Sequence, residues 1–326
     1  MLDARSPVPM PVEPLAPDTL SLRYWLMFFV ITGAGLFDLF DIFIVGFIIA
    51  KLGSEWTLSY GQAAIMLMAG GIGAILGALV SGILADRFGR RLVFLVTTAI
   101  TGLASLALAS LPSGAWIAFC LLRAVIGFGA AGATTVQSAM IVEFTPLKWR
   151  GTLPGLALSI GSFGIFGASL LSALLLNSIG WRGLAAIGSL PLLFCVIGYW
   201  TVPESPLWIA GRHRARSERS ERATASSNVS LGSSDLPSPR ESLTGRFLLL
   251  FLAWLCVSTA MNGVYLWGPT VLAYVTMVPV HEAAAAFMIV SIAGILGKFA
   301  FSFSPALIGR RRSAQIAGFG GAAMLA

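Results

Sequence analysis

The chain has 326 residues, 57% of them hydrophobic and only 11% charged, and its mean hydropathy is +0.86. A soluble domain of this length could not hide so much apolar surface in one core, so the composition excludes a soluble globular protein. The formal charge of +7 would suit a nucleic-acid partner. However, the basic residues gather at the ends of apolar runs, where they indicate membrane topology instead.

Apolar runs along the chain predict an all-α membrane protein. A helix that crosses a membrane needs about 20 mostly apolar residues. Eight such runs are expected at about 24–50, 62–84, 92–111, 115–141, 153–176, 183–202, 247–272 and 283–308. A ninth begins at Ser313 and stops with the chain at Ala326, so we expect a sequence truncated after about 8.5 transmembrane helices.

The basic residues predict how these helices cross the membrane. Seventeen of the 21 lysine and arginine residues fall in segments on one side. Only Lys51 and Arg182 fall on the other side, and Arg123 and Lys298 lie inside helices. By the positive-inside rule, the N-terminus and the long segment after the sixth helix are cytoplasmic. The charge is thus explained by topology, and no nucleic-acid partner is expected.

Four segments follow from this pattern. Residues 1–22 are expected to be a disordered cytoplasmic tail and 23–203 a bundle of six helices. Residues 204–246 are expected to form a cytoplasmic central loop, with room for a short helix after Pro206, and 247–326 an incomplete second bundle. GILADRFGRR follows the second helix and SFSPALIGRR the eighth, and such duplication is typical of transporters whose substrate site lies near the membrane midplane.

Small residues and cysteines inside the helices are interpreted as packing residues. Glycines recur at spacings of three and four, as at Gly73 and Gly77, and such positions let helices approach closely in lipid. The three cysteines, Cys120, Cys195 and Cys256, lie in predicted helices, and no two are closely spaced. We assign none of these residues to substrate binding.

Three ionisable residues are expected to form a site inside the membrane. A charged side chain at the centre of a membrane helix is costly, so it faces a cavity or a partner. Asp38 and Asp41 in the first helix share one face, and Arg123 in the fourth lies at a depth similar to that of Asp41. An Asp41–Arg123 contact is therefore feasible, either as a structural pair or as a centre for proton coupling and anion binding.

A second charged group lies at the expected cytoplasmic ends of the helices. Opposite charges at the mouth of a helix bundle can pair in one conformation and separate in another, which makes them a gate. Solvated ion pairs worth only about 0–1 kcal/mol are the alternative. The group contains Asp86, Arg87, Arg90, Arg91, Glu143, Lys148 and Arg150.

The second half carries candidate substrate contacts. Asn262, Tyr265 and Trp267 lie close together in MNGVYLWGPT, where Pro269 can interrupt the seventh helix. Trp267 also suits an interface anchor. Lys298 in the eighth helix either extends toward the cytoplasm or faces the transport pathway.

With these residues, the chain after Arg23 resembles the major facilitator superfamily. GILADRFGRR is similar to that family's motif between helices two and three, and RAVIGFGAAG, at 123–132, is similar to its motif in helix four. PESPLW, at 203–208, follows helix six as in sugar-porter-like and organic-acid members, and its Glu204 joins the gating group. The pattern E-x-x-P-x-x-x-R-G is reproduced by Glu143, Pro146, Arg150 and Gly151.

The acidic motif in the first helix resembles one subfamily more closely. Asp38-Leu39-Phe40-Asp41 is similar to the motif of the aromatic-acid:proton symporters, in which glycine usually follows the first aspartate. Leu39 departs from that pattern, but both carboxylates are kept. The fifth helix lacks the Gly-Pro and Gly-Gly elements of drug:proton antiporters, so the resemblance favours uptake over efflux.

The resemblance implies a 6+6 helix bundle that works by alternating access. Helices one, four and seven would surround the cavity, with Asp38, Asp41 and Arg123 as the coupling centre and Asn262 and Tyr265 facing them. The expected function is proton-coupled uptake of a small organic anion, such as an aromatic or other carboxylic acid. Sugar or polyol symport and a truncated remnant without transport activity are the alternatives.

An intramembrane enzyme is the rival from another class. Two aspartates inside a membrane could do acid-base chemistry, but no Gly-x-Gly-Asp or His-Glu-x-x-His motif accompanies them. We therefore expect no enzyme, no cofactor and no metal site. The expected partners are a small-molecule substrate, protons and membrane lipid, for a monomer in the plasma membrane, which is the inner membrane of a bacterium.

Overall fold

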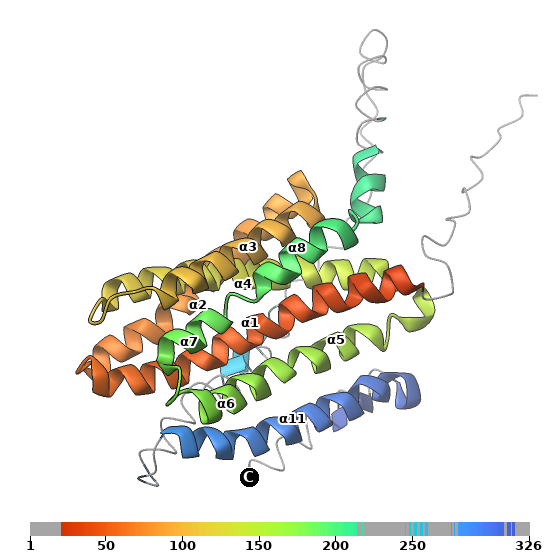
Figure 1. The fold of residues 1–326 in the computed structure, drawn as a ribbon. Helices are drawn as coiled ribbons and strands as arrows, with labels where there is room; N and C mark the ends of the chain where they lie inside the picture. Colours follow the sequence, from red (N-terminus) through yellow and green to blue (C-terminus); the bar gives the residue numbers. More distant parts are fainter. Residues whose placement is uncertain are drawn as a thin grey trace, which may run out of the picture.

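The computed structural model describes residues 21–213 and 280–309 without a break, together with isolated residues between 217 and 277 and between 312 and 316. Every regular element in this part of the chain is helical (Figure 1). The all-α prediction is therefore confirmed.

Four long helices form the first part of the fold. Each of the first two begins with a serine cap: Ser21 Oγ accepts from the Tyr24 main-chain N–H over 3.2 Å, and Ser59 and Gln62 form a capping box. These caps satisfy N–H groups that have no partner within the helix. The helices are α1 Leu22–Glu55, α2 Tyr60–Phe88, α3 Arg90–Ala109 and α4 Trp116–Phe144.

The next two membrane segments are each divided into two helices, where the sequence predicted one. The main-chain N–H of Ser162 bonds to the carbonyls of Leu158 and Ser159, which tightens the chain between α5 and α6. Pro191 begins α8 because proline suits the first turn of a helix. The remaining elements are the short helix η1 Leu147–Trp149, α5 Leu153–Gly161, α6 Phe163–Leu175, α7 Gly180–Ile187, α8 Pro191–Thr201 and α11 Val280–Ile308.

Six segments of the described chain are long and apolar enough to cross a membrane, and they match the first six predicted spans. This result identifies an integral membrane protein. The eighth predicted span is α11, whereas nearly all of the seventh and ninth lies outside the described residues. The six segments are Leu22–Gly53, Tyr60–Phe88, Arg90–Ala109, Trp116–Phe144, Leu153–Leu175 and Gly180–Thr201.

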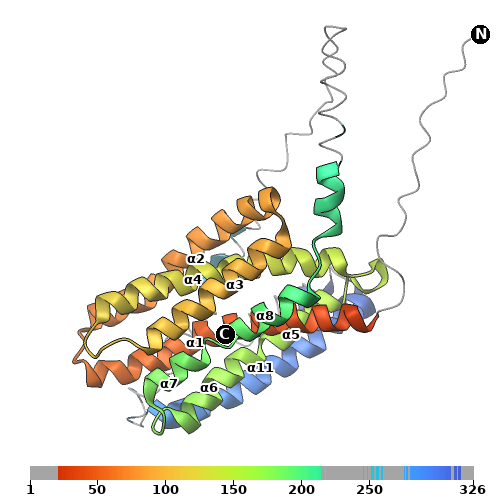
Figure 2. The ribbon, with the colours of Figure 1, turned by 45° about the horizontal axis from the view of Figure 1, so that its top comes forward.

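The helices lie side by side with α1 at the centre. Both ribbon views show α1 flanked by α8 and by α5, while α11 runs along α5 and α6 (Figures 1 and 2). Helices α2 and α4 pack most closely, because glycines bring their backbones together. A Cβ atom on Gly73 would overlap the carbonyl of Ala124, and one on Gly77 would overlap that of Phe128. The prediction that these glycines serve packing is confirmed.

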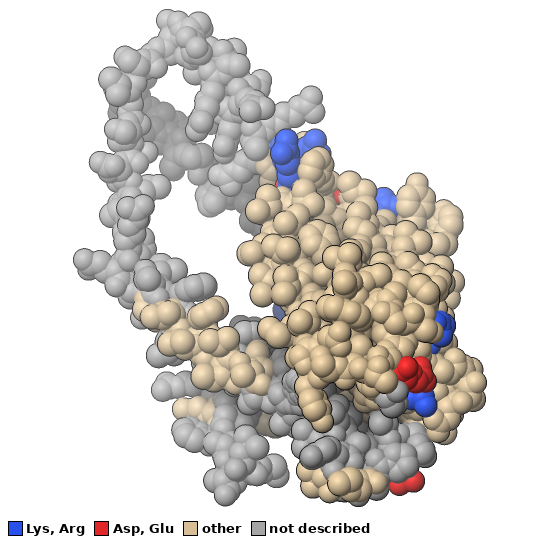
Figure 3. All heavy atoms as spheres, turned by 90° about the vertical axis from the view of Figure 1, so that its left-hand side faces the viewer, with Lys and Arg blue, Asp and Glu red and all other residues tan. Residues whose placement is uncertain are grey.

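The two ends of the bundle are distinct. At one end, Trp56 packs on Trp181 with ring centroids 5.5 Å apart, and Arg182 Nη2 donates to the Leu111 carbonyl over 2.9 Å. Figure 3 faces this end, where the charged side chains of the described residues are few and scattered. At the opposite end, the Tyr24 and Thr145 hydroxyls are 3.0 Å apart. The charged group predicted to form a gate lies at this opposite end.

The duplicated sequence motifs share a backbone feature. Gly89 follows the end of α2 with φ +106°, and Gly309 follows the end of α11 with φ +86°. Both values lie in the region that glycine adopts far more readily than other residues. The two GRR segments thus begin with the same kind of helix termination, which supports the interpretation of an internal repeat.

Candidate functional site

Asp41 and Arg123 form an ion pair between α1 and α4. Arg123 Nη1 donates to Asp41 Oδ2 over 2.6 Å, and only 4% of Arg123 and 5% of Asp41 is exposed. The two helices run in opposite directions, which brings these positions to a similar depth, as their places in the sequence suggested. The contact that was feasible from the sequence is therefore present in the fold.

Space for the arginine comes from a glycine on α2. A Cβ atom on Gly70 would lie 3.2 Å from Arg123 Nη2, a distance at which one of the two groups would have to move. Gly70 thus lets the guanidinium lie close to the α2 backbone while it bonds to Asp41. Since a buried charge without a partner is costly, the three positions depend on one another.

Asp38, one helical turn before Asp41, has a different partner. Thr134 Oγ1 on α4 lies 2.8 Å from Asp38 Oδ2, and 5% of Asp38 is exposed. A hydroxyl can donate to a carboxylate or accept from a protonated carboxyl group. The fold therefore gives one aspartate a fixed cation and the other a neutral partner that suits either protonation state.

These residues line a cavity of about 930 Å³ between α1, α2 and α4. The α2 wall is made of glycine, alanine and aliphatic residues such as Leu67 and Met68. An apolar wall facing a few convergent polar groups is typical of sites for small organic molecules. The polar lining consists of Asp38, Asp41, Arg123, Thr134, Thr135 and Ser138.

Thr134 was not among the residues predicted from the sequence. Its position carried a usable signal, because it follows Arg123 by 11 residues, about three helical turns, and so lies on the same face of α4. The hydroxyl itself gave no reason to prefer it over the other Ser and Thr residues of that helix. Asn262 and Tyr265, the predicted contacts from the second half, lie outside the described residues.

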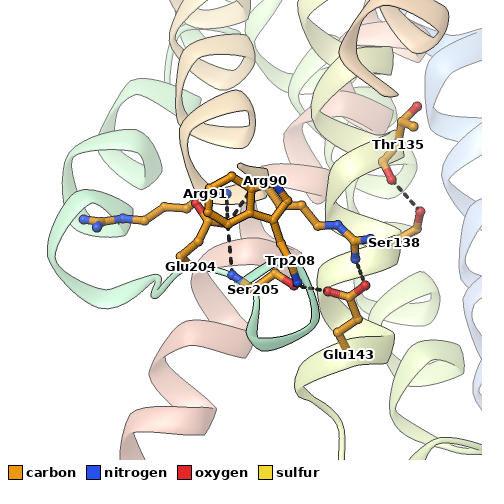
Figure 4. Close-up of polar contacts among 8 residues, drawn as sticks. All are labelled: Arg90, Arg91, Thr135, Ser138, Glu143, Glu204, Ser205 and Trp208. Carbon is orange, nitrogen blue, oxygen red and sulfur yellow. Dashed lines mark hydrogen bonds and ion pairs between the residues drawn. The ribbon is translucent and has the colours of Figure 1, made fainter. Parts of the chain in front are cut away.

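A second polar cluster lies at the end of the bundle where α2 and α4 terminate (Figure 4). Arg90, at the start of α3, forms an ion pair with Glu143 in the last turn of α4. The Ser205 hydroxyl donates to the same Glu143 carboxylate. One carboxylate thus joins three segments that are distant in the sequence.

Glu204 acts mainly as a cap for α3. Its Oε1 accepts from the main-chain N–H groups of Arg90 and Arg91 at 2.8 and 3.1 Å. Carboxylates stabilise helix N-termini in this way, and α3 has no cap from its own preceding residue. Gly89 allows the approach, since a Cβ atom there would collide with the Glu204 carboxylate.

The other predicted gate residues have separate partners among the described residues. The Asp86 carbonyl accepts from Trp208 Nε1 over 2.8 Å, and Arg150 Nε donates to the Thr145 carbonyl over 3.1 Å. Arg91 donates to the Tyr199 carbonyl, and its guanidinium lies over the Tyr199 ring. Arg87 lies over the ring of the adjacent Phe88. Within the described chain, only Arg90 and Glu143 of the predicted gate form an ion pair with each other.

Lys298 on α11 contacts the break between α5 and α6. Its Nζ donates to Ser162 Oγ over 2.8 Å, and nearby the Ser159 and Ser302 hydroxyls are 2.9 Å apart. The lysine is half-buried between helices of the two halves. The side chain therefore connects the second half to the first in this conformation.

The sequence and the fold can be compared with those of known proteins. Residues 31–326 match the family model of the Major Facilitator Superfamily. The chain belongs to this superfamily. The family resemblance noted in the sequence is thereby confirmed.

Two curated relatives and one solved structure illustrate the similarity. The niacin transporter NiaP of Acinetobacter baylyi is 30% identical over 74% of this chain and 58% of its own length. The gallate transporter of Pseudomonas putida is 31% identical over 60% of this chain and 43% of its own length. The proton:xylose symporter XylE shares the fold, with a TM-score of 0.66 and 22% identity over 88% of this chain and 70% of its own.

These matches bear on the function and on the extent of the chain. The chain spans about half the length of the two curated relatives. Both are transporters by name, and this agrees with the expectation that the protein is not an enzyme.

Proposed function

We propose that the protein takes up a small organic anion together with protons, as a secondary active transporter that works by alternating access. The observation that carries this proposal is the buried Asp41–Arg123 ion pair beside Asp38 on the wall of a cavity of about 930 Å³. Three ionisable groups at similar depth in a membrane are costly unless they are paired, hydrated or functional. A coupling centre accounts for all three.

The proposed coupling uses one shared cation. The carboxylate of an incoming substrate competes with Asp41 for Arg123, while Asp38 carries the proton. Competition of this kind links the two binding events, because a change in anion affinity caused by protonation requires an equal change in proton affinity caused by the anion. Asn262 and Tyr265 are proposed as contacts from the second half.

The chemistry of the relatives' substrates supports an aromatic carboxylic acid. Niacin and gallate, named for the two curated relatives, each combine an aromatic ring with a carboxylate. The cavity offers the same pair of environments, with the aliphatic α2 wall facing the Arg123 guanidinium. A proton-coupled sugar or polyol symporter is the second candidate, supported by fold similarity to a xylose symporter.

We propose the inner membrane of a bacterium as the location, with the N-terminus and the 204–246 loop cytoplasmic and the molecule a monomer. The 17 to 2 distribution of basic residues supports this orientation. The ion pair of Arg90 with Glu143 then lies at the cytoplasmic mouth, where it would open and close with the transport cycle.

Uptake by proteoliposomes tests the proposal. Radiolabelled nicotinate, 4-hydroxybenzoate and xylose are supplied with an inward proton gradient, and a protonophore controls for coupling. We expect accumulation of the aromatic acids, its loss in both Asp38→Asn and Asp41→Asn, and retained exchange in at least one of them. Glu55→Gln, which changes a carboxylate paired with Lys51 at the other end, is the matched control. Accumulation at the wild-type level in both aspartate variants would refute the proposal.

A further inference from the structure

The hydroxyl of Thr134 on α4 has one hydrogen to donate, and two acceptor oxygens lie within hydrogen-bond distance of it. Its Oγ1 lies 2.8 Å from Asp38 Oδ2 and 3.0 Å from the main-chain oxygen of Ala130, one helical turn earlier. A hydroxyl group has a single O–H donor and two acceptor lone pairs. When Asp38 is ionised, the hydroxyl therefore cannot give a full hydrogen bond to both oxygens at once.

Protonation of Asp38 changes this balance. The added proton sits on Oδ2, the new O–H donates to Thr134 Oγ1, and the threonine O–H is then free to donate to the Ala130 carbonyl. When Asp38 releases its proton to the cavity, the threonine O–H rotates and donates to Oδ2. One proton enters or leaves, and each state has its own set of hydrogen bonds.

We infer that Thr134 is a positioning residue that responds to the protonation of Asp38 by making or releasing its bond to the α4 backbone. This inference rests on the proposed role of Asp38 as the proton carrier. Bonds from threonine to the carbonyl four residues earlier bend helices slightly, so the exchange acts on the shape of α4. Since α4 also carries Arg123, the state of Asp38 would reach the anion-binding cation through this helix.

Among the described residues, Thr134 is the side chain that hydrogen-bonds to Asp38, and the other ionisable groups nearby have different partners. Asp41 on the same helix and Arg123 on α4 are the charged groups beside it, and they bond to each other. The α2 residues that line the cavity are uncharged, and α5 and α6 contain no ionisable residue. Other titratable groups on helices packed against α1 have their own contacts or lie at the helix ends: Cys120, Cys195, Tyr60, Tyr199, Arg182, Lys298, His281, Glu282, Asp86, Arg87 and Glu143.

Infrared difference spectroscopy of the detergent-solubilised full chain, titrated across pH, tests this inference. The band of the protonated Asp38 carboxyl is identified by its loss in Asp38→Asn. In Thr134→Val, which removes the hydroxyl and keeps the shape, we expect that band to move to higher frequency because the acid has lost its acceptor. The midpoint of its titration should move up by about 0.5–1 pH unit, since the ionised form loses a donor.

The matched variants separate the inference from a general effect of substitution. Thr134→Ser keeps the hydroxyl and should restore both the frequency and the midpoint. Thr135→Val removes the next hydroxyl, which donates to the Ala131 carbonyl over 2.8 Å, and should change neither. Thr134 is exposed on the cavity side, so valine is expected to fold, and Thr134→Ala provides a second deletion of the hydroxyl.

Two results would overturn the inference. An Asp38 band that never titrates is one, and equal spectra for wild-type protein, Thr134→Val and Thr134→Ala are the other. If Asp38→Asn abolishes uptake while Thr134→Val and Thr134→Ala give the wild-type spectrum, this inference fails and the proposed function stands. If both aspartate variants accumulate substrate normally, the proposed function fails whatever the spectra show.

Discussion

The Arg90 guanidinium pairs with the Glu143 carboxylate and thereby joins the first turn of α3 to the last turn of α4. The same carboxylate accepts from Ser205, which follows α8. The bonds of this one carboxylate therefore connect three segments at this end of the bundle.

The ion pair predicts a change in rate rather than in recognition. Glu143→Gln removes the charge attraction, and a shift of about 1–3 kcal/mol between conformations would follow, or roughly 5- to 150-fold. We expect a lower maximal uptake rate with the KM of each competing acid nearly unchanged. Kinetics in proteoliposomes measure both quantities, with Glu55→Gln as the control. Altered substrate preference at an unchanged maximal rate would contradict a gating role.

The competition for Arg123 predicts opposite effects of two substitutions on anion binding. Asp41→Asn removes the competitor, so a labelled aromatic acid should bind more tightly by about tenfold, whereas Arg123→Ala should weaken binding strongly. Equilibrium binding in detergent micelles measures both effects. Weaker binding in Asp41→Asn would show that the aspartate supports the anion site instead of competing for it.

The contact between α2 and α4 predicts a position-specific effect on stability. Gly73→Ala places a methyl group against the Ala124 carbonyl, and overpacking of this kind costs about 1–3 kcal/mol. Gly82 on the same helix has open space around its Cβ position, so Gly82→Ala is the matched control. We expect a lower midpoint of thermal unfolding in detergent for the first variant alone. Equal midpoints would show that the helices have room to separate at Gly73.

The distribution of basic residues predicts the orientation. Alkaline phosphatase, which is active only after export, should be active when fused after Gly53 or Ser113 and inactive when fused after Gly89 or Arg222. A cytoplasmic reporter fused at the same sites should give the reverse pattern. Phosphatase activity after Arg222, or its absence after Gly53, would contradict the predicted orientation.

Local sequence predicted most of the helices but not their interruptions. Length and hydropathy located the first six spans, because the membrane imposes about 20 apolar residues on each crossing. The break at Ser162 was not predicted, because Gly161 and Ser162 resemble small residues that the same span carries elsewhere within helices, such as Gly167 and Ser169. The Ser162 hydroxyl receives a hydrogen bond from Lys298, and the sequence contains no sign of that partner.

The candidate site was likewise predicted in part from the sequence and in part decided by the packing of the helices. The cost of burying charge singled out Asp38, Asp41 and Arg123 from the sequence, and the rise of the helix gave Asp41 and Arg123 a similar depth. That depth is a property of each helix by itself. The rotation of the helices about their axes, however, is set by packing between them.

The sequence by itself thus determined the membrane-embedded helical architecture, the family motifs and the charged residues whose burial requires a partner. Only the tertiary structure decided that Arg123 bonds to Asp41, that Thr134 contacts Asp38 and that Glu204 caps α3. The reason is physical. Hydropathy and helix rise are properties of one segment, whereas a hydrogen bond depends on helix rotation and on close approach, which glycines such as Gly70 and Gly89 permit.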